Sequence, residues 1–174
     1  MELNKNTEQN AGFTLIELMV VIGILSIMSS IAIPNIISWL PDYRLRSATR
    51  EIVSCLQDAK LRGVKENLRA VVIFDQTNES YTAFVDNVPV GGNWALDATE
   101  TIIRQGTMPA GVDIQSVSAT STTSYTFGFN KRGLSDAGAN RLQLINNKSN
   151  YSRIIVNLPG RIRVQMSSDG INWN

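Results

Sequence analysis

Hydrophobic residues are distributed very unevenly along this chain. Residues 1–12 are polar, whereas residues 13–33 are almost uninterruptedly apolar and leave no polar face. At a rise of about 1.5 Å per residue, about 20 such residues span the hydrocarbon core of a bilayer. A helix on a protein surface would keep a polar stripe. A secretory signal peptide would have a shorter apolar core and a small-residue exit site. Residues 13–40 are therefore predicted to form a membrane-spanning helix.

Residues 41–67 follow the pattern of an amphipathic helix. Apolar side chains recur at steps of three and four residues, with charged residues at other positions. This stripe should pack on a sheet, and the lone cysteine within it should be a small buried side chain. Pro41 is placed to start this half of the helix or to bend the join. The predicted stripe consists of Leu45, Ala48, Ile52, Cys55, Leu56 and Ala59.

Residues 68–174 alternate short runs rich in Val, Ile, Tyr and Thr with turn-prone sequences such as Pro159-Gly160. The runs predict strands, and no long helical pattern separates them, so an antiparallel arrangement is expected. The predicted fold class is α+β, with a long N-terminal α-helix, half transmembrane and half amphipathic, packed on an antiparallel β-sheet domain. The strands are predicted at Ala70–Asp75, Ser80–Asp86, Glu100–Arg104, Val112–Ser118, Ser124–Phe129, Arg141–Ile145, Arg153–Asn157 and Arg161–Met166.

One charged residue, Glu17, interrupts the apolar run. A carboxylate in lipid costs on the order of several kcal/mol, so an acid there indicates a functional site. The run contains no basic residue, and the partner amine must come from a new N-terminus made by cleavage upstream or from a neighbouring subunit. The surrounding sequence, Gly12-Phe13-Thr14-Leu15-Ile16-Glu17-Leu18, resembles the processing motif of type IV pilins.

This resemblance implies a role for four residues. A prepilin peptidase would cut between Gly12 and Phe13, remove residues 1–12 as a leader, and methylate the new amine of Phe13. Glu17 would be the assembly residue, and pairing with the amine of an adjacent Phe13 would neutralise both charges in lipid. Pro34 matches a proline of the family and can kink the helix, since it lacks a backbone donor.

The resemblance also implies a location. The chain would be a single-pass protein of the bacterial inner membrane, with its C-terminal domain in the periplasm, and it would be incorporated into a pilus or pseudopilus. The residues that follow the span, Arg44, Arg46 and Arg50, would favour the opposite orientation by the positive-inside rule. The expected orientation therefore rests on the family resemblance alone.

Charge and composition limit the kinds of partner and of chemical site that this chain can have. The formal net charge is +1, yet residues 70–129 carry one basic and six acidic residues, whereas residues 130–174 carry seven basic and two acidic ones. A basic C-terminal part indicates an anionic partner or a dispersed, solvated surface. The chain has no histidine and one cysteine, which excludes an internal disulfide, a Cys/His metal site and histidine catalysis. No catalytic motif is recognisable, so neither an enzyme nor a cofactor is predicted.

Two stretches of the C-terminal half, FGFNKRG at 127–133 and IIV to GRIRV at 154–164, resemble the GspH/FimT group of minor subunits. Residues 160–163 also resemble the GRxR signature of a DNA-binding subgroup. On a strand, Arg161 and Arg163 would share one face, while Ile162 and Val164 would face the core. Arginine suits phosphate because its fork donates two parallel hydrogen bonds. The site would be widened by Lys131, Arg132 and Arg153.

Two functions remain open. The first is a minor pilin of a type IV pilus that also captures double-stranded DNA. The second is a minor pseudopilin of a type II secretion system, which takes part in protein export without binding DNA. Both imply the same partners otherwise, namely other pilins or pseudopilins, a prepilin peptidase and membrane lipid. The paired Arg161 and Arg163 are the feature that distinguishes the two.

Overall fold

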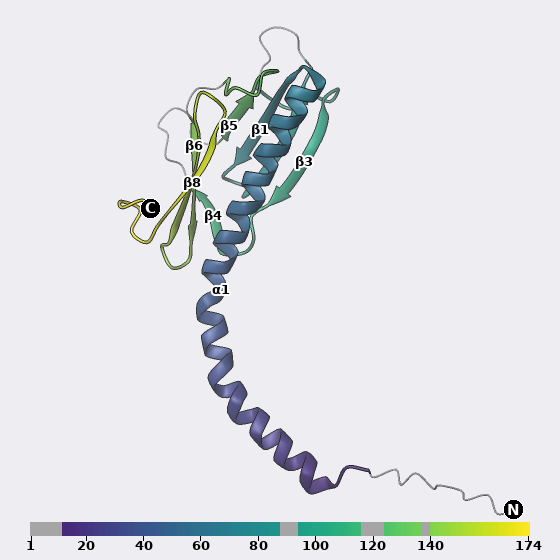
Figure 1. The fold of residues 1–174 in the computed structure, drawn as a ribbon, viewed down its shortest axis with the longest axis vertical. Coiled ribbons are helices and arrows are strands. Elements are labelled where there is room, and N and C mark those ends of the chain that lie inside the picture. The colour runs from purple at the N-terminus through teal and green to yellow at the C-terminus, as the bar shows by residue number, and fades with distance from the viewer. Residues whose placement is uncertain (1–11, 88–93, 116–123, 137–139) are drawn as a thin grey trace, which may run out of the picture. The chain divides into compact units, whose positions relative to one another are not determined.

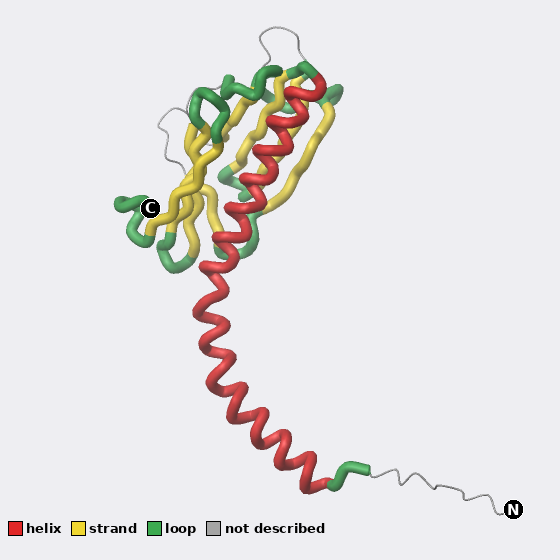
Figure 2. The backbone as a smooth tube through the Cα atoms, in the orientation of Figure 1, coloured by secondary structure: helices red, strands yellow, loops and turns green. Residues whose placement is uncertain are grey.

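The computed structural model describes residues 12–87, 94–115, 124–136 and 140–174. The chain divides into two compact units, Met1–Trp39 and Leu40–Asn174. One helix and eight strands follow one another in the described residues (Figure 1; Figure 2). They are α1 (Leu15–Glu66), β1 (Arg69–Asp75), β2 (Ser80–Asp86), β3 (Thr101–Thr107), β4 (Val112–Gln115), β5 (Ser124–Phe129), β6 (Asn140–Asn146), β7 (Tyr151–Val156) and β8 (Ile162–Ser167).

The first unit is the apolar half of α1. Its large apolar side chains, such as Ile16, Leu25 and Ile31, are exposed. By length and composition, this helix can cross a membrane. Helical structure runs without interruption through Pro34 and Pro41, so neither proline ends the helix. The kink expected at Pro34 stays a prediction.

The half of α1 that belongs to the second unit buries the predicted stripe. All six of its predicted residues are buried, from Leu45 to Ala59, and Thr49 and Gly63 are buried beside them. Cys55 is fully buried, and this burial raises the pKa of its thiol to about 12, so the thiol is unreactive at neutral pH. The predicted structural role of Cys55 is therefore confirmed.

The β domain contains two four-stranded antiparallel sheets, in the orders β3-β2-β1-β5 and β4-β6-β7-β8. One core joins α1 to both sheets, with Phe74 and Phe127 meeting edge to face at 5.6 Å. Polar contacts also hold the helix to the sheets: for example, the Tyr81 hydroxyl donates to Glu51 at 2.6 Å, and the Thr49 hydroxyl donates to that of Ser152 at 2.9 Å. The antiparallel α+β fold is thus confirmed, with the strands divided between two sheets.

Several predicted strand ends need correction. β1 begins one residue earlier than predicted, at Arg69, and β3 begins one residue later, at Thr101. β3 ends at Thr107 instead of Arg104, while β6, β7 and β8 each begin and end one or two residues away from the predicted positions. The predicted strand 112–118 ends at Gln115 in the described part of the chain, and its last residues lie outside the described ranges. Val164 pairs with the buried Ile154 and so lies on the core side of β8, as predicted, but its side chain is still 43% exposed. β8 is an edge strand, and Val164 faces a groove beside α1.

Candidate functional site

The predicted processing site lies in exposed, non-helical backbone. Phe13 is 88% exposed, and a Cβ placed on Gly12 would meet no atom within 4 Å. The helix begins only at Leu15, where the Thr14 hydroxyl accepts a hydrogen bond from the Glu17 N–H at 3.3 Å. Thr14 and Glu17 thus have the spacing of a capping box, and the carboxylate lies where the helix dipole favours negative charge. The bond between Gly12 and Phe13 is open to a peptidase.

A second set of predicted residues lies on two turns that touch. Ser135 donates its N–H to the Leu158 carbonyl at 3.0 Å, and a Cβ on Gly160 would collide with the Gly133 carbonyl. Lys60 of α1 donates to the Gly160 carbonyl at 2.9 Å and fixes the second turn to the helix. The fold therefore brings Lys131 and Arg132 on one turn close to the second turn, which Arg161 follows. All three of these side chains are exposed.

The residues of the FGFNKRG stretch, at 127–133, have identifiable structural roles. Phe127 and Phe129 point into the core, whereas Gly128 lies under the ring of Trp94, where a Cβ would not fit. The side-chain oxygen of Asn130 then accepts from the N–H groups of Arg132 and Leu134, which closes the turn. Asn130 thus fixes the backbone that carries the exposed cations.

The outer face of the second sheet carries a row of arginines. In the strand register Arg141 of β6 lies opposite Ile155 of β7, and Ile155 lies opposite Arg163 of β8. Strands are about 4.8 Å apart, so the backbones of Arg141 and Arg163 are separated by about 10 Å on one face. Arg153 belongs to the next row, between Gln143 and Gln165. Since side chains alternate along a strand, Arg153 shares this face.

Arg153 differs from the other arginines of this face. Its guanidinium carbon lies 3.5 Å from the centroid of the Trp173 ring, a cation–π contact. Its Nε is buried and has no hydrogen-bond partner among the described residues. Burial, and then the positive charge of Arg141, lower the pKa of Arg153. A neighbouring cation that raises the electrostatic cost of charging Arg153 shows that positive charge concentrates here.

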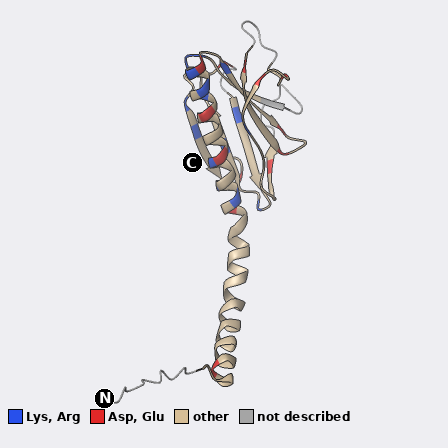
Figure 3. Ribbon diagram, turned by 90° about the vertical axis from the view of Figure 1, so that its right-hand side faces the viewer, with Lys and Arg blue, Asp and Glu red and all other residues tan. Residues whose placement is uncertain are grey.

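No acidic side chain of the described residues forms an ion pair with the cations of this surface. Within the part of the chain that the structure describes, the ion pairs involve Arg62, Arg69 and Arg104. None of these ion pairs involves the six C-terminal cations, which we call the basic surface. Figure 3 marks the positions of Lys and Arg in blue and those of Asp and Glu in red along α1 and the strands. The basic surface consists of Lys131, Arg132, Arg141, Arg153, Arg161 and Arg163.

The sequence predicted part of this arrangement. Arg161 and Arg163 are both exposed, but Arg161 lies just before β8, at the turn, and Arg163 lies on the sheet. Arg141 was missed because only the strand register places it beside Arg163. Trp173 was missed because it follows the last strand; an aromatic residue near a basic strand was the available signal.

The comparisons with known proteins agree with these features. Residues 9–33 match the prokaryotic N-terminal methylation motif, and residues 48–160 match the family described as type II transport protein GspH. The fold is similar to crystal structures of the type IV minor pilin FimU of Pseudomonas aeruginosa, one with a TM-score of 0.55, 17% identity, and coverage of 76% of this chain and 94% of that one. The minor pseudopilin EpsH from the type 2 secretion system of Vibrio cholerae gives a TM-score of 0.51, 11% identity, and coverage of 70% and 95%. No curated protein matches significantly. Because the GspH match covers more than half of its length, this chain belongs to the GspH family of pilin-like proteins and carries their N-terminal methylation motif.

Proposed function

We propose that this pilin-like structural subunit serves a type IV pilus as a minor pilin and that its basic surface captures double-stranded DNA. The observation that carries the proposal is the clustering of cations that have no acidic partner among the described residues: two basic turns in contact, continued by Arg163 and Arg141 across the sheet. Fixed guanidinium groups bind phosphate oxygens through paired hydrogen bonds. Such a surface recognises the nucleic-acid backbone and not its sequence, and its affinity falls steeply with salt.

The N-terminal part of the proposal concerns maturation. The peptidase cuts after Gly12, the amine of Phe13 is methylated, and Glu17 then pairs with the Phe13 amine of the adjacent subunit. The exposed scissile bond and the capped helix that starts two residues later support this order. The apolar helix is consistent with an inner-membrane prepilin, and the C-terminal domain lies in the periplasm before assembly.

DNA binding is tested by titrating residues 42–174 with double-stranded DNA at two salt concentrations. This part contains the whole buried core, which runs from Leu45 to Ser167. The Arg161→Ala/Arg163→Ala variant should bind more weakly, and its logarithmic salt slope should fall by about 2 because each lost phosphate contact removes about 0.9. The matched control, Arg62→Ala/Arg104→Ala, removes the same charge from arginines that already have acidic partners.

Two results would contradict this function. Absence of binding at low salt would remove the DNA-capture part, and equal losses in the two double variants would show a general charge effect. Either result would favour the second candidate, a minor pseudopilin of a type II secretion system. The match to the type II transport protein GspH family supports this candidate.

Maturation is tested separately by the mass of the protein isolated from membranes. We expect residues 13–174 plus one methyl group for the native sequence and the complete chain for Gly12→Val. Glu17→Gln should still be processed but should not enter filaments. Full assembly of Glu17→Gln would contradict the proposed charge pairing.

A further inference from the structure

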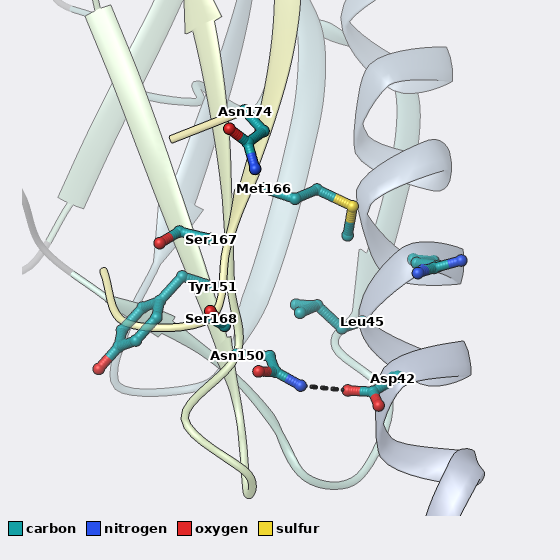
Figure 4. A pocket seen from close by; sticks show the side chains of 9 residues that line it. Asp42, Leu45, Asn150, Tyr151, Met166, Ser167, Ser168 and Asn174 are labelled. Carbon is teal, nitrogen blue, oxygen red and sulfur yellow. Dashed lines mark hydrogen bonds between the residues drawn. The ribbon is translucent and has the colours of Figure 1, made fainter. Parts of the chain in front are cut away.

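A groove runs along one flank of the β domain, between α1 and β8. It consists of two neighbouring pockets of about 320 and 380 Å³, which share Arg46 and Met166 among their lining residues. The lining residues of the helix extend from Asp42 to Gln57, which corresponds to about 22 Å along its axis. Figure 4 shows the end of the groove near Asp42, with the Met166 side chain directed from β8 towards the helix.

One wall of this groove is an open sheet edge. β8 is the last strand of its sheet, and Asn157 donates to the Arg161 carbonyl at 3.1 Å, which fixes the hydrogen-bonding pattern with β7. In an antiparallel pair the bonded positions alternate. The N–H and C=O groups of Ile162, Val164 and Met166 therefore point away from β7.

This edge already accepts a strand-like partner at one end. Met166 and Asn174 exchange both backbone hydrogen bonds, at 3.0 and 3.1 Å, as residues of an antiparallel ladder do. Beyond this pair, no strand of the described chain lies next to β8. The backbone groups of Ile162 and Val164 thus continue an edge that has the geometry for strand addition.

The side chains define what can dock there. Val53 and Val164 give the groove an apolar floor next to Met166, and Val164 is 43% exposed. Arg46 and Arg50 line the same groove, are exposed, and form no ion pair within the described ranges. An occupant needs backbone donors and acceptors for the edge, an apolar side chain for the floor, and a negative charge for the arginines.

We propose that this groove binds an extended, acidic segment of a neighbouring filament subunit, which adds to β8 as a further strand. An α-helix does not fit this chemistry, because its backbone groups are already paired internally. A polyanion does not fit either, since phosphate cannot donate to the outward carbonyls of Ile162 and Val164. The groove and the outer face that carries Arg163 lie on different sides of β8, so this inference does not depend on DNA binding.

The test follows hydrogen exchange of the full chain in detergent micelles with synthetic ten-residue peptides. The peptides alternate valine and threonine and end in glutamate, in lysine, or in glutamate with prolines at two alternate positions. The glutamate peptide should slow exchange at Ile162 and Val164 by about tenfold. The lysine peptide should act more weakly, and the proline peptide should have no effect because it lacks donors.

Two variants locate the effect. Arg50→Glu should reverse the preference between the glutamate and lysine peptides. Val164→Pro removes an outward N–H without breaking a bond to β7, and it should abolish protection while circular dichroism stays unchanged. If Val164→Pro unfolds the domain, Arg50→Glu still decides the question.

Several results would overturn the proposal. These are equal protection by the glutamate and lysine peptides, protection of β3 instead of β8, or protection by a DNA duplex but not by any peptide. If the same amides are protected without peptide, and the protection increases with protein concentration, the occupant of the groove is a second copy of this chain and not a different subunit.

Discussion

The arginines of the two sheets differ in their interaction partners. In the first sheet, Arg69 donates to Asp86 at 2.9 Å and lies 4.7 Å from the Trp94 ring, while Arg104 lies 3.6 Å from Asp58 of the helix. In the second sheet, Arg141 and Arg163 have no acidic partner among the described residues. The first set helps to hold the fold, whereas the second carries charge without an acidic partner among the described residues, at the cost of like-charge repulsion.

The largest change in stability is expected when the Arg69–Asp86 ion pair of the first sheet is removed. Asp86 is almost completely buried, and Asp86→Ala leaves the guanidinium of Arg69 without its main partner. Removing one member of a buried pair costs about 3 kcal/mol, measured as the free energy of unfolding in urea. Asp113→Ala, an exposed acid on β4, should change stability by less than about 0.5 kcal/mol. Equal costs for the two variants would show that the Arg69 pair is not structural.

The next effect concerns the contact between the two basic turns. Gly160 has a φ of +71°, and a Cβ there would collide with the Gly133 carbonyl, so Gly160→Ala should destabilise the domain by about 2 kcal/mol and weaken DNA binding. Gly170→Ala has the same backbone strain, with a φ of +73°, but meets only the Tyr151 ring at 3.2 Å. It should cost about 1 kcal/mol and leave binding unchanged. Unaltered DNA binding in a destabilised Gly160→Ala protein would argue against the joint surface.

A smaller effect tests how the second sheet is fastened to the helix. The Asp42 carboxylate accepts hydrogen bonds from Asn150 at 2.6 Å and Asn146 at 2.9 Å, and the Asn150 bond is the main cause of the lowered pKa of Asp42 (Figure 4). Asp42→Ala should cost about 1 kcal/mol at pH 7.

The pH dependence of this effect has a definite sign. Because the folded pKa of Asp42 is depressed, its stabilising contribution is complete above the ordinary value of 3.8 and is lost as the pH falls through the lowered pKa. The difference between native protein and variant, followed by thermal unfolding, should therefore shrink below pH 3.8. Asn147→Ala, on the same turn, should not alter the pH profile. A pH-independent difference would assign the cost to packing alone.

The smallest effect compares one arginine from each sheet. Arg104→Gln loses a half-exposed ion pair and should cost about 0.5 kcal/mol. Arg163→Gln loses no ion pair and relieves repulsion, so at low salt it should be neutral or stabilising by less than about 0.5 kcal/mol, and the gain should vanish as salt is added. A cost for Arg163→Gln equal to that for Arg104→Gln would remove the distinction between the two sheets.

The features predicted well from sequence are those encoded by neighbours along the chain. The helical stripe from Leu45 to Ala59 is buried as its spacing indicates, and every predicted strand overlaps an observed one. The strand ends shift because hydrogen bonding to a neighbouring strand, not local propensity, decides where a strand stops. The exposure of Val164 was not foreseen for a related reason: alternation gives the correct face but does not reveal that β8 is an edge strand beside an open groove.

The sequence by itself therefore determined the long apolar helix, the motif from Gly12 to Glu17, the amphipathic stripe and the antiparallel β domain, because each rests on periodicity or composition within a short window. Only the tertiary structure decided that Arg141 lies in a row with Arg163, that the turn of Arg132 touches that of Arg161, and that Trp173 covers Arg153. These contacts join residues from separate elements, and they exist because one shared core fixes the register of strands that the local sequence leaves free.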